Sequence, residues 1–146
     1  MQRPMLVGEY DFTLDAKNRV AVPARLRSAF ADGMYVTVDA GPCLSVYPPE
    51  GFQAFLDRRS AGISPLSKRG RDLQRYTTAN AVHLALDGQG RIMLPARHLK
   101  HAHIEREVTI LGVEDHLEIW DRVGWAEYLA LLEEEADATA DELAAS

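Results

Sequence analysis

The sequence predicts a mainly β fold with short helices (α+β), built from two copies of one unit, and three observations support this prediction. The stretch 14–25 recurs at 86–97, with six identical positions of twelve and two more that are aliphatic in both. Hydrophobic and polar residues alternate along neighbouring segments, as in half-buried strands. Residues that favour tight turns interrupt this alternation. Since internal repeats decide an architecture, the repeated hairpin is the expected basis of the fold.

Each copy is expected to contain four strands and a short helix. Asn18 tolerates positive φ in the first hairpin turn, and Gly88 and Gly90 do so in the second. Pro23 and Pro95 each suit the first turn of a short helix, where a missing N–H costs nothing. The expected strands are 9–14, 19–22, 34–39 and 43–47 in the first copy, and 82–86, 91–94, 108–113 and 117–120 in the second.

Helices are also expected between the copies and at the C-terminus. Pro48-Pro49 opens a helix, and 66–76, with four Lys and Arg residues, predicts a basic helix with a solvated face. Asp121 is expected to cap the last helix. The apolar stripe of that helix is Trp125, Tyr128, Leu129 and Leu132. From Ala136 onward little is left to bury, so fraying is expected.

Neither copy is large enough for a robust core of its own, because each spans only about 45 residues. Four short strands with one apolar face must cover that face, and the other copy is the available partner. The expected arrangement is an intramolecular pseudo-dimer, in which interleaved strands would also protect the sheet edges.

Composition bounds the class of protein. With 47% hydrophobic residues and a single cysteine, Cys43, the chain can form a globular core but no intrachain disulfide. No segment resembles a signal peptide or a membrane span, so a cytoplasmic location without a membrane partner is expected. The net charge of −6 is divided unevenly, with +5 on residues 1–104 and −11 on residues 105–146. The acidic end is interpreted as a solvated helix and tail.

The repeated Asp-x-x-x-Arg pattern is the candidate site. Asp15 and Asp87 can accept backbone N–H groups of their turns. Arg19 and Arg91, four residues on, can reach these carboxylates. The Asp–Arg pair can have a purely structural role that stabilises each turn, although exposed ion pairs contribute only ~0–1 kcal/mol to the free energy of folding. A guanidinium held in this way is also a preorganised reader of phosphate or guanine, and the two interpretations are compatible.

Further basic residues flank both hairpins and favour a polyanionic partner. Lys17, Arg25 and Arg97 are expected to contact phosphates and so to give salt-dependent affinity, while base-edge contacts set the sequence. For Arg25 and Arg97, a place at a subunit interface is the alternative. A two-stranded ribbon fits the major groove of B-DNA. The expected partner is therefore double-stranded DNA, and no cofactor or metal is expected.

The stretches 8–25 and 86–92, together with Leu117-Glu118-Ile119-Trp120-Asp121 and Trp125, resemble the MraZ family of bacterial transcription regulators. The resemblance covers roughly 5–132 in the right order. It implies two AbrB/SpoVT-like swapped-hairpin repeats that form a pseudo-dimeric barrel, followed by a C-terminal helix. The expected limits are 8–52 for the first domain, 53–80 for a helical connector, 81–124 for the second domain and 125–146 for the C-terminal helix and acidic tail.

The resemblance also implies a function. Family members bind DNA repeats upstream of the division and cell-wall gene cluster, usually repress it, and form ring-shaped homo-oligomers, which implies a nucleoid-associated regulator. The family's DNA-contacting arginines map onto Arg19 and Arg91. Lys17 matches a basic position of the first motif, and Gln89 is its counterpart. Asn18 replaces the usual glycine of the first turn and tolerates the same backbone region.

Three other classes of protein fit parts of the pattern. An aspartic-protease dyad needs two carboxylates that share a proton, but each motif Asp has an Arg nearby that favours the ionised form, so no enzyme is expected. His98, His101 and His103 have no carboxylate or Cys to complete a zinc site and are interpreted as solvated. A protein-interaction or oligomeric scaffold module with purely structural hairpins is the third alternative. The acidic tail can also compete with DNA for the basic surface.

Overall fold

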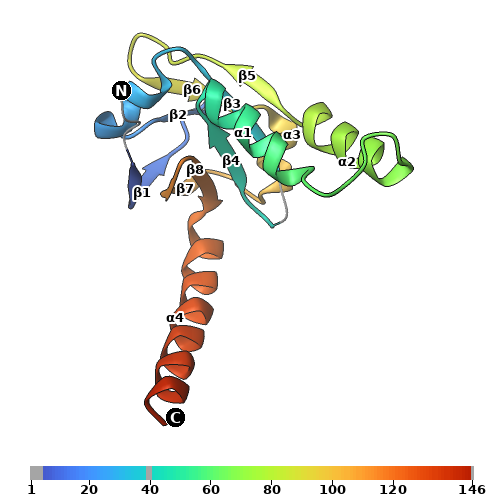
Figure 1. The fold of residues 1–146 in the computed structure, drawn as a ribbon. Helices are drawn as coiled ribbons and strands as arrows, with labels where there is room; N and C mark the ends of the chain where they lie inside the picture. Colours follow the sequence, from blue (N-terminus) through green and yellow to red (C-terminus); the bar gives the residue numbers. More distant parts are fainter. Residues whose placement is uncertain (1–4, 39–40, 146) are drawn as a thin grey trace.

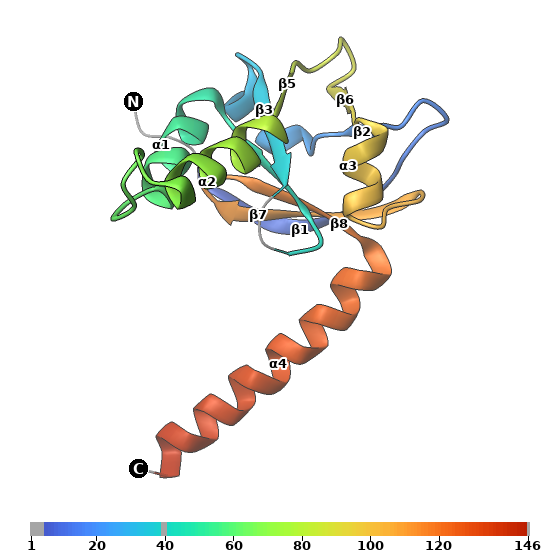
Figure 2. The same cartoon turned by 90° about the vertical axis from the view of Figure 1, so that its right-hand side faces the viewer.

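The computed structural model describes residues 5–38 and 41–145. An antiparallel sheet forms the centre, α1 and α2 lie beside it, and α4 projects away from the body (Figures 1 and 2). The elements are β1 (Leu6–Thr13), β2 (Arg19–Ala21), the 3-10 helix η1 (Ala24–Phe30), β3 (Met34–Val38), β4 (Leu44–Tyr47), α1 (Pro49–Arg59), α2 (Lys68–Ala79), β5 (Val82–Leu84), β6 (Arg91–Met93), α3 (Ala96–His101), β7 (Glu107–Glu114), β8 (Leu117–Asp121) and α4 (Arg122–Ala145).

The strands of the two repeats are interleaved, as the sequence predicts. The larger sheet has the order β1-β7-β8-β4-β3-β5, and β2 and β6 form a separate two-stranded sheet. Strand β1 of the first repeat pairs with β7 of the second, and β5 of the second repeat pairs with β3 of the first. Strands β4 and β8 pair with each other, as do β2 and β6. Each pairing therefore maps onto itself or onto its counterpart when the repeats are exchanged.

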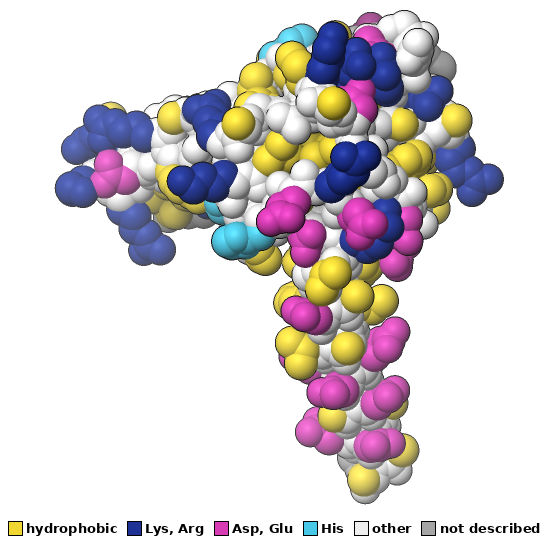
Figure 3. Space-filling model, turned by 180° about the vertical axis from the view of Figure 1, so that it is seen from behind, with side chains coloured by type: hydrophobic (Ala, Val, Ile, Leu, Met, Phe, Trp, Pro, Cys, Tyr) yellow, Lys and Arg dark blue, Asp and Glu magenta, His cyan; other side chains and the backbone are white. Residues whose placement is uncertain are grey.

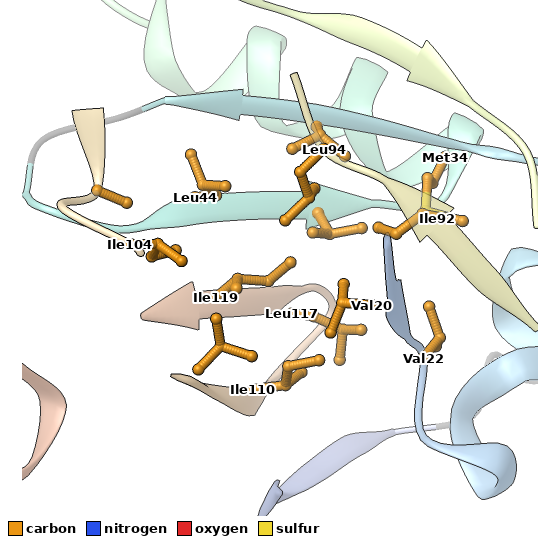
Figure 4. Packing of buried hydrophobic residues seen from close by; sticks show 14 of the residues in the cluster. Val20, Val22, Met34, Leu44, Ile92, Leu94, Ile104, Ile110, Leu117 and Ile119 are labelled. Carbon is orange, nitrogen blue, oxygen red and sulfur yellow. The ribbon is translucent and has the colours of Figure 1, made fainter. Parts of the chain in front are cut away.

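Both repeats contribute to one hydrophobic core. Side chains from β2, β3 and β4 meet side chains from β6, β7 and β8 in a single cluster (Figure 4). Val20 and Ile92, at equivalent positions, lie opposite each other in the β2–β6 pair and are both buried. Full burial of such a side chain stabilises the fold by about 1.5–3 kcal/mol. Because eleven buried residues of the cluster come from the first repeat and nine from the second, neither repeat could keep this core by itself.

The expected strands and helices are found within a few residues of their positions. The third strand, expected over 34–39, is Met34–Val38, and residue 39 lies outside the described residues. Cys43 is buried, as expected of a small apolar residue. No helix within the described ranges is long and apolar enough to cross a membrane.

Helix α4 differs from its prediction in two ways. The expected fraying from Ala136 is wrong, because the helix continues to Ala145. The expected apolar stripe packs on the body only at its start: Trp125 is partly buried against Trp120, whereas Tyr128 is 44% exposed and no residue of α4 is fully buried. The physical reason is that α4 leaves the body after its first turns (Figure 2). Its start is as predicted, since Asp121 Oδ2 accepts the N–H of Gly124 at 3.0 Å.

Candidate nucleic-acid interface

The two Asp-x-x-x-Arg hairpins lie side by side, because β2 and β6 pair antiparallel. Beyond this ladder, the N–H of Val22 donates to the carbonyl of Gly90, and the N–H of Leu94 donates to the carbonyl of Asn18, both at 2.9 Å. These equivalent bonds join the turn of each repeat to the return strand of the other. The backbone itself therefore fixes the spacing of the two hairpins.

Each turn is closed by a residue in the left-handed backbone region. Asn18 has φ of 59° and Gly90 has φ of 74°. The N–H of Asn18 donates to the carbonyl of Asp15 at 3.0 Å, and the equivalent bond from Gly90 in the second turn is also 3.0 Å. The prediction that asparagine can replace glycine in the first turn is confirmed.

In the first hairpin, Asp15 holds both the turn and the arginine. Its Oδ1 accepts the backbone N–H groups of Lys17 and Arg19, both at 2.9 Å. Its Oδ2 accepts Nε of Arg19 at 2.7 Å. These bonds, the backbone N–H of Arg19 above all, lower the pKa of Asp15 to about 2. The carboxylate is therefore ionised at neutral pH and cannot share a proton as a catalytic dyad would.

The second hairpin repeats this arrangement. Asp87 Oδ1 accepts the N–H groups of Gln89 at 2.8 Å and of Arg91 at 2.9 Å, and Oδ2 accepts Nε of Arg91 at 3.0 Å. The backbone bond from Arg91 is the main cause of a lowered pKa for Asp87. One contact has no counterpart among the ion pairs of the described residues: Nη1 of Arg91 also lies 3.6 Å from Oδ2 of Asp15. Arg91 therefore interacts with the carboxylates of both hairpins.

The two motif arginines are at the surface. The side chain of Arg19 is 31% exposed and that of Arg91 is 27% exposed. In each, the carboxylate occupies Nε and fixes the plane of the guanidinium, while the terminal nitrogens carry further N–H donors. Arginines held like this can present a planar pair of donors to an acceptor pair without first losing side-chain entropy.

The three supporting residues of the candidate site, Lys17, Arg25 and Arg97, are all exposed. Within the described part of the chain, none of them forms an ion pair with a carboxylate. Their positive charges are therefore uncompensated beside the hairpins, an arrangement that favours a polyanion.

One contact between the repeats was not predicted from the sequence. Nε of Arg27 donates to the carbonyl of Val22 at 2.8 Å, and a Cβ at Gly90 would lie 2.4 Å from Arg27 Cζ. The guanidinium of the first repeat thus covers the turn of the second. The residue equivalent to Arg27 is Leu99, which has no guanidinium to make the equivalent contact. The only available signal was this Arg-for-Leu difference at the repeat offset.

The histidine cluster is partly different from its prediction. His98, expected to be solvated, is 1% exposed, and its Nε2 lies 2.7 Å from the carbonyl oxygen of Asn80. Burial lowers the pKa of His98 and so favours the neutral ring at neutral pH. The burial of His98 could have been predicted from the repeat, because the equivalent residue of the first copy is Leu26, which is buried. Across residues 5–38 and 41–145, no three His, Cys, Asp or Glu side chains are grouped to hold a metal.

Fold and site together define a class of protein: a two-repeat chain whose intertwined hairpins present two carboxylate-bound arginines next to each other. The protein-family model described as "MraZ protein, putative antitoxin-like" matches residues 5–74 and 78–145 of this chain.

Curated relatives agree with this match over nearly the whole chain. The "Transcriptional regulator MraZ" of Limosilactobacillus fermentum is 38% identical, covering 97% of this chain and 95% of the relative. The protein of the same name from Nocardia farcinica is 39% identical, with 94% and 96% covered, and that of a Nocardioides species is 42% identical, with 85% of each covered. The chain belongs to the MraZ family, which confirms the resemblance. These relatives are named as transcriptional regulators, in agreement with the prediction that this chain is not an enzyme.

Proposed function

We propose that the chain is a sequence-specific DNA-binding transcriptional regulator that represses the bacterial division and cell-wall gene cluster by binding tandem promoter repeats. The observation that carries the proposal is the pair of adjacent hairpins, each with an arginine whose Nε is held by its own carboxylate. The printed names of the relatives, regulators of transcription, support it.

The proposed roles follow from the geometry of each side chain. Arg19 and Arg91 read base edges, because a guanidinium matches the O6 and N7 acceptors of guanine in the major groove. Asp15 and Asp87 orient these arginines through the Nε bonds. The exposed Lys17, Arg25 and Arg97 contact phosphates and contribute affinity that does not depend on sequence.

Assembly would supply the affinity that one hairpin pair lacks. We propose a ring-shaped homo-oligomer that acts on the nucleoid, in the cytoplasm, with several protomers engaging several DNA repeats so that weak contacts combine. Within each protomer, the proposed domains 8–52 and 81–124 form one pseudo-dimeric barrel. The segments 53–80 and 125–146 are the proposed connector and C-terminal extension.

The test is a gel shift with DNA from the region upstream of the protein's own gene, against scrambled DNA, over a salt series. The double variant Arg19→Ala, Arg91→Ala should lose the preference for the native region, while its oligomer mass stays unchanged. Arg58→Ala with Arg106→Ala is a matched control, since both arginines are exposed and lie outside the hairpins. Equal binding of native and scrambled DNA by the unaltered protein would show a nonspecific binder.

The contact between Arg91 and Asp15 favours a second candidate, an oligomeric scaffold in which the hairpins are only structural. Under that alternative, the double variant would unfold at lower urea concentration and the unaltered protein would show no DNA preference. An unchanged urea midpoint together with lost DNA preference would favour the regulator.

A further inference from the structure

Over most of its length, helix α4 packs against no other part of residues 5–38 and 41–145. It has 24 residues, none of them buried, and its main contacts are with β7 and β8. Near its start, Tyr128 stacks on Trp120 with ring centroids 5.2 Å apart. Beyond that point, Leu131 and Leu132 are 55% and 36% exposed. Helices without tertiary packing are marginal in water, so the outer half of α4 is expected to pack on another surface.

The charges of α4 also indicate that the helix packs on another surface. Its outer half carries a run of carboxylates, and Arg122 is the only basic residue of the helix. The carboxylates are Glu133, Glu134, Glu135, Asp137, Asp141 and Glu142. The C-terminal end of a helix is the negative end of its dipole, so acidic residues there are unfavourable. None of the six forms an ion pair elsewhere in residues 5–38 and 41–145. A basic surface would neutralise these six carboxylates and so reduce the repulsion between them and from the negative end of the helix dipole.

Helix α2 provides the complementary surface. It carries four Lys and Arg residues and one acidic residue, Asp72. Lys68 and Arg75 share that carboxylate, at 2.6 and 2.9 Å, and their side chains are 84% and 68% exposed. Leu66, just before the helix, and Tyr76 within it are exposed as well. The surface of α2 is thus basic, with apolar side chains beside the charges (Figure 3). It is complementary to the outer half of α4, which is acidic and also has exposed apolar side chains.

The spacing of the charges also agrees. On α4, Glu134, Asp137 and Asp141 stand at i, i+3 and i+7 and so share one face. On α2, Lys68, Arg71 and Arg75 have the same spacing. Each row is about 10.5 Å long at the rise of an α-helix. Two such helices laid alongside each other bring three carboxylates against three basic groups.

The two helices cannot make this contact within one chain as it is folded. The outer half of α4 and α2 are separated in both ribbon views (Figures 1 and 2). Helix α2 also lies at the opposite end of the body from the β2–β6 hairpins (Figure 1). DNA held at the hairpins of a protomer would therefore not run along the α2 of that protomer.

We propose that the outer half of α4 docks on α2 of a second copy of this chain. The contact joins two different surfaces, so each copy offers the outer half of its α4 to one neighbour and the exposed side of its α2 to another, and repetition closes into a ring or continues as a filament. This inference rests on the proposed homo-oligomer and names the surfaces that hold it together.

Charge reversal in the full-length protein tests the contact, with mass measured by sedimentation at low salt. Glu134→Lys with Asp137→Lys and Asp141→Lys should lower the mass towards the 16.2 kDa of a single chain. Lys68→Glu with Arg71→Glu and Arg75→Glu should do the same. All six changes in one chain should restore the oligomer. The matched control reverses three exposed carboxylates of the body, Glu9, Asp32 and Glu105, and should leave the mass unchanged.

Each other outcome overturns the proposal. If the α2 variant keeps its mass but binds all DNA more weakly, α2 contacts DNA. If only the α4 variant loses mass, α4 pairs with another surface. If the six-fold variant, shown to be folded by a urea midpoint near that of the unaltered chain, stays dissociated, the two rows do not meet. Failure of the hairpin function is separate, because it appears as lost DNA preference with unchanged mass.

Discussion

Replacing both motif arginines by lysine separates positive charge from oriented hydrogen bonding. Arg19→Lys with Arg91→Lys keeps the net charge but removes the Nε atoms that Asp15 and Asp87 hold at 2.7 and 3.0 Å. A lysine ammonium is a flexible point charge and cannot offer the planar pair of donors that matches guanine. The variant should therefore still bind DNA, but without a preference for the native sequence over scrambled DNA.

The expected size of this effect follows from two hairpins per protomer. A bidentate arginine–guanine pair discriminates by about 1–3 kcal/mol, so two pairs give about 2–6 kcal/mol. At 1.4 kcal/mol per tenfold, the preference for native over scrambled DNA should fall at least roughly 30-fold per protomer. The salt dependence should stay nearly constant, because the number of neutralised phosphates does not change.

Fluorescence anisotropy titrations with labelled native and scrambled duplexes at several salt concentrations measure both quantities. A preference that survives lysine substitution would refute the role of the oriented guanidinium. A preference that is lost together with most of the salt dependence would also refute it, because the arginines would then act as general phosphate contacts.

Three further predictions concern the scaffold. Phe30→Ala, at a fully buried position, should lower the free energy of unfolding by about 3–5 kcal/mol in urea titrations; a loss below 1 kcal/mol would contradict a rigid shared core. Gly90→Ala should cost at least about 1–2 kcal/mol, because φ is +74° and the new Cβ would strike Arg27, and an unchanged thermal midpoint would show that this turn relaxes freely. Burial opposes a charge on His116, but bonds to Glu118 and Asp115 outweigh it and raise its pKa above 6.5. The stability from this charge is present below pH 6.5 and lost as pH rises through the raised pKa. The urea midpoint should thus fall between pH 6 and pH 8 less in His116→Gln than in the unaltered chain, and identical pH profiles would refute the assignment.

The repeat explains why so much of the fold could be predicted. Period-two alternation located the strands, and the small size of each copy required the other to cover its apolar face. Asn18 in the first turn was predictable as well, because its backbone preference is local. The Asp–Arg bonds were predictable for the same reason, since the partners are four residues apart in a tight turn.

The remainder depends on contacts that local sequence does not encode. The position of Arg27 over Gly90 joins residues from different repeats. The burial of His98 follows from its equivalence to Leu26 and not from its own chemistry. The extent of α4 was underestimated because the prediction counted only apolar surface available for burial, whereas the helix continues without burying any.

The central claim, that the paired hairpins read guanines in DNA, is tested most directly by methylation interference. Upstream DNA methylated at guanine N7 is bound by the protein, and the bound and free fractions are cleaved and compared. Because N7 is one of the two acceptors an arginine would use, methylated guanines at the positions read by Arg19 and Arg91 in each repeat should be depleted from the bound fraction. The same experiment with Arg19→Ala, Arg91→Ala should show no depletion. Identical cleavage patterns in the bound and free fractions of the unaltered protein would contradict the account.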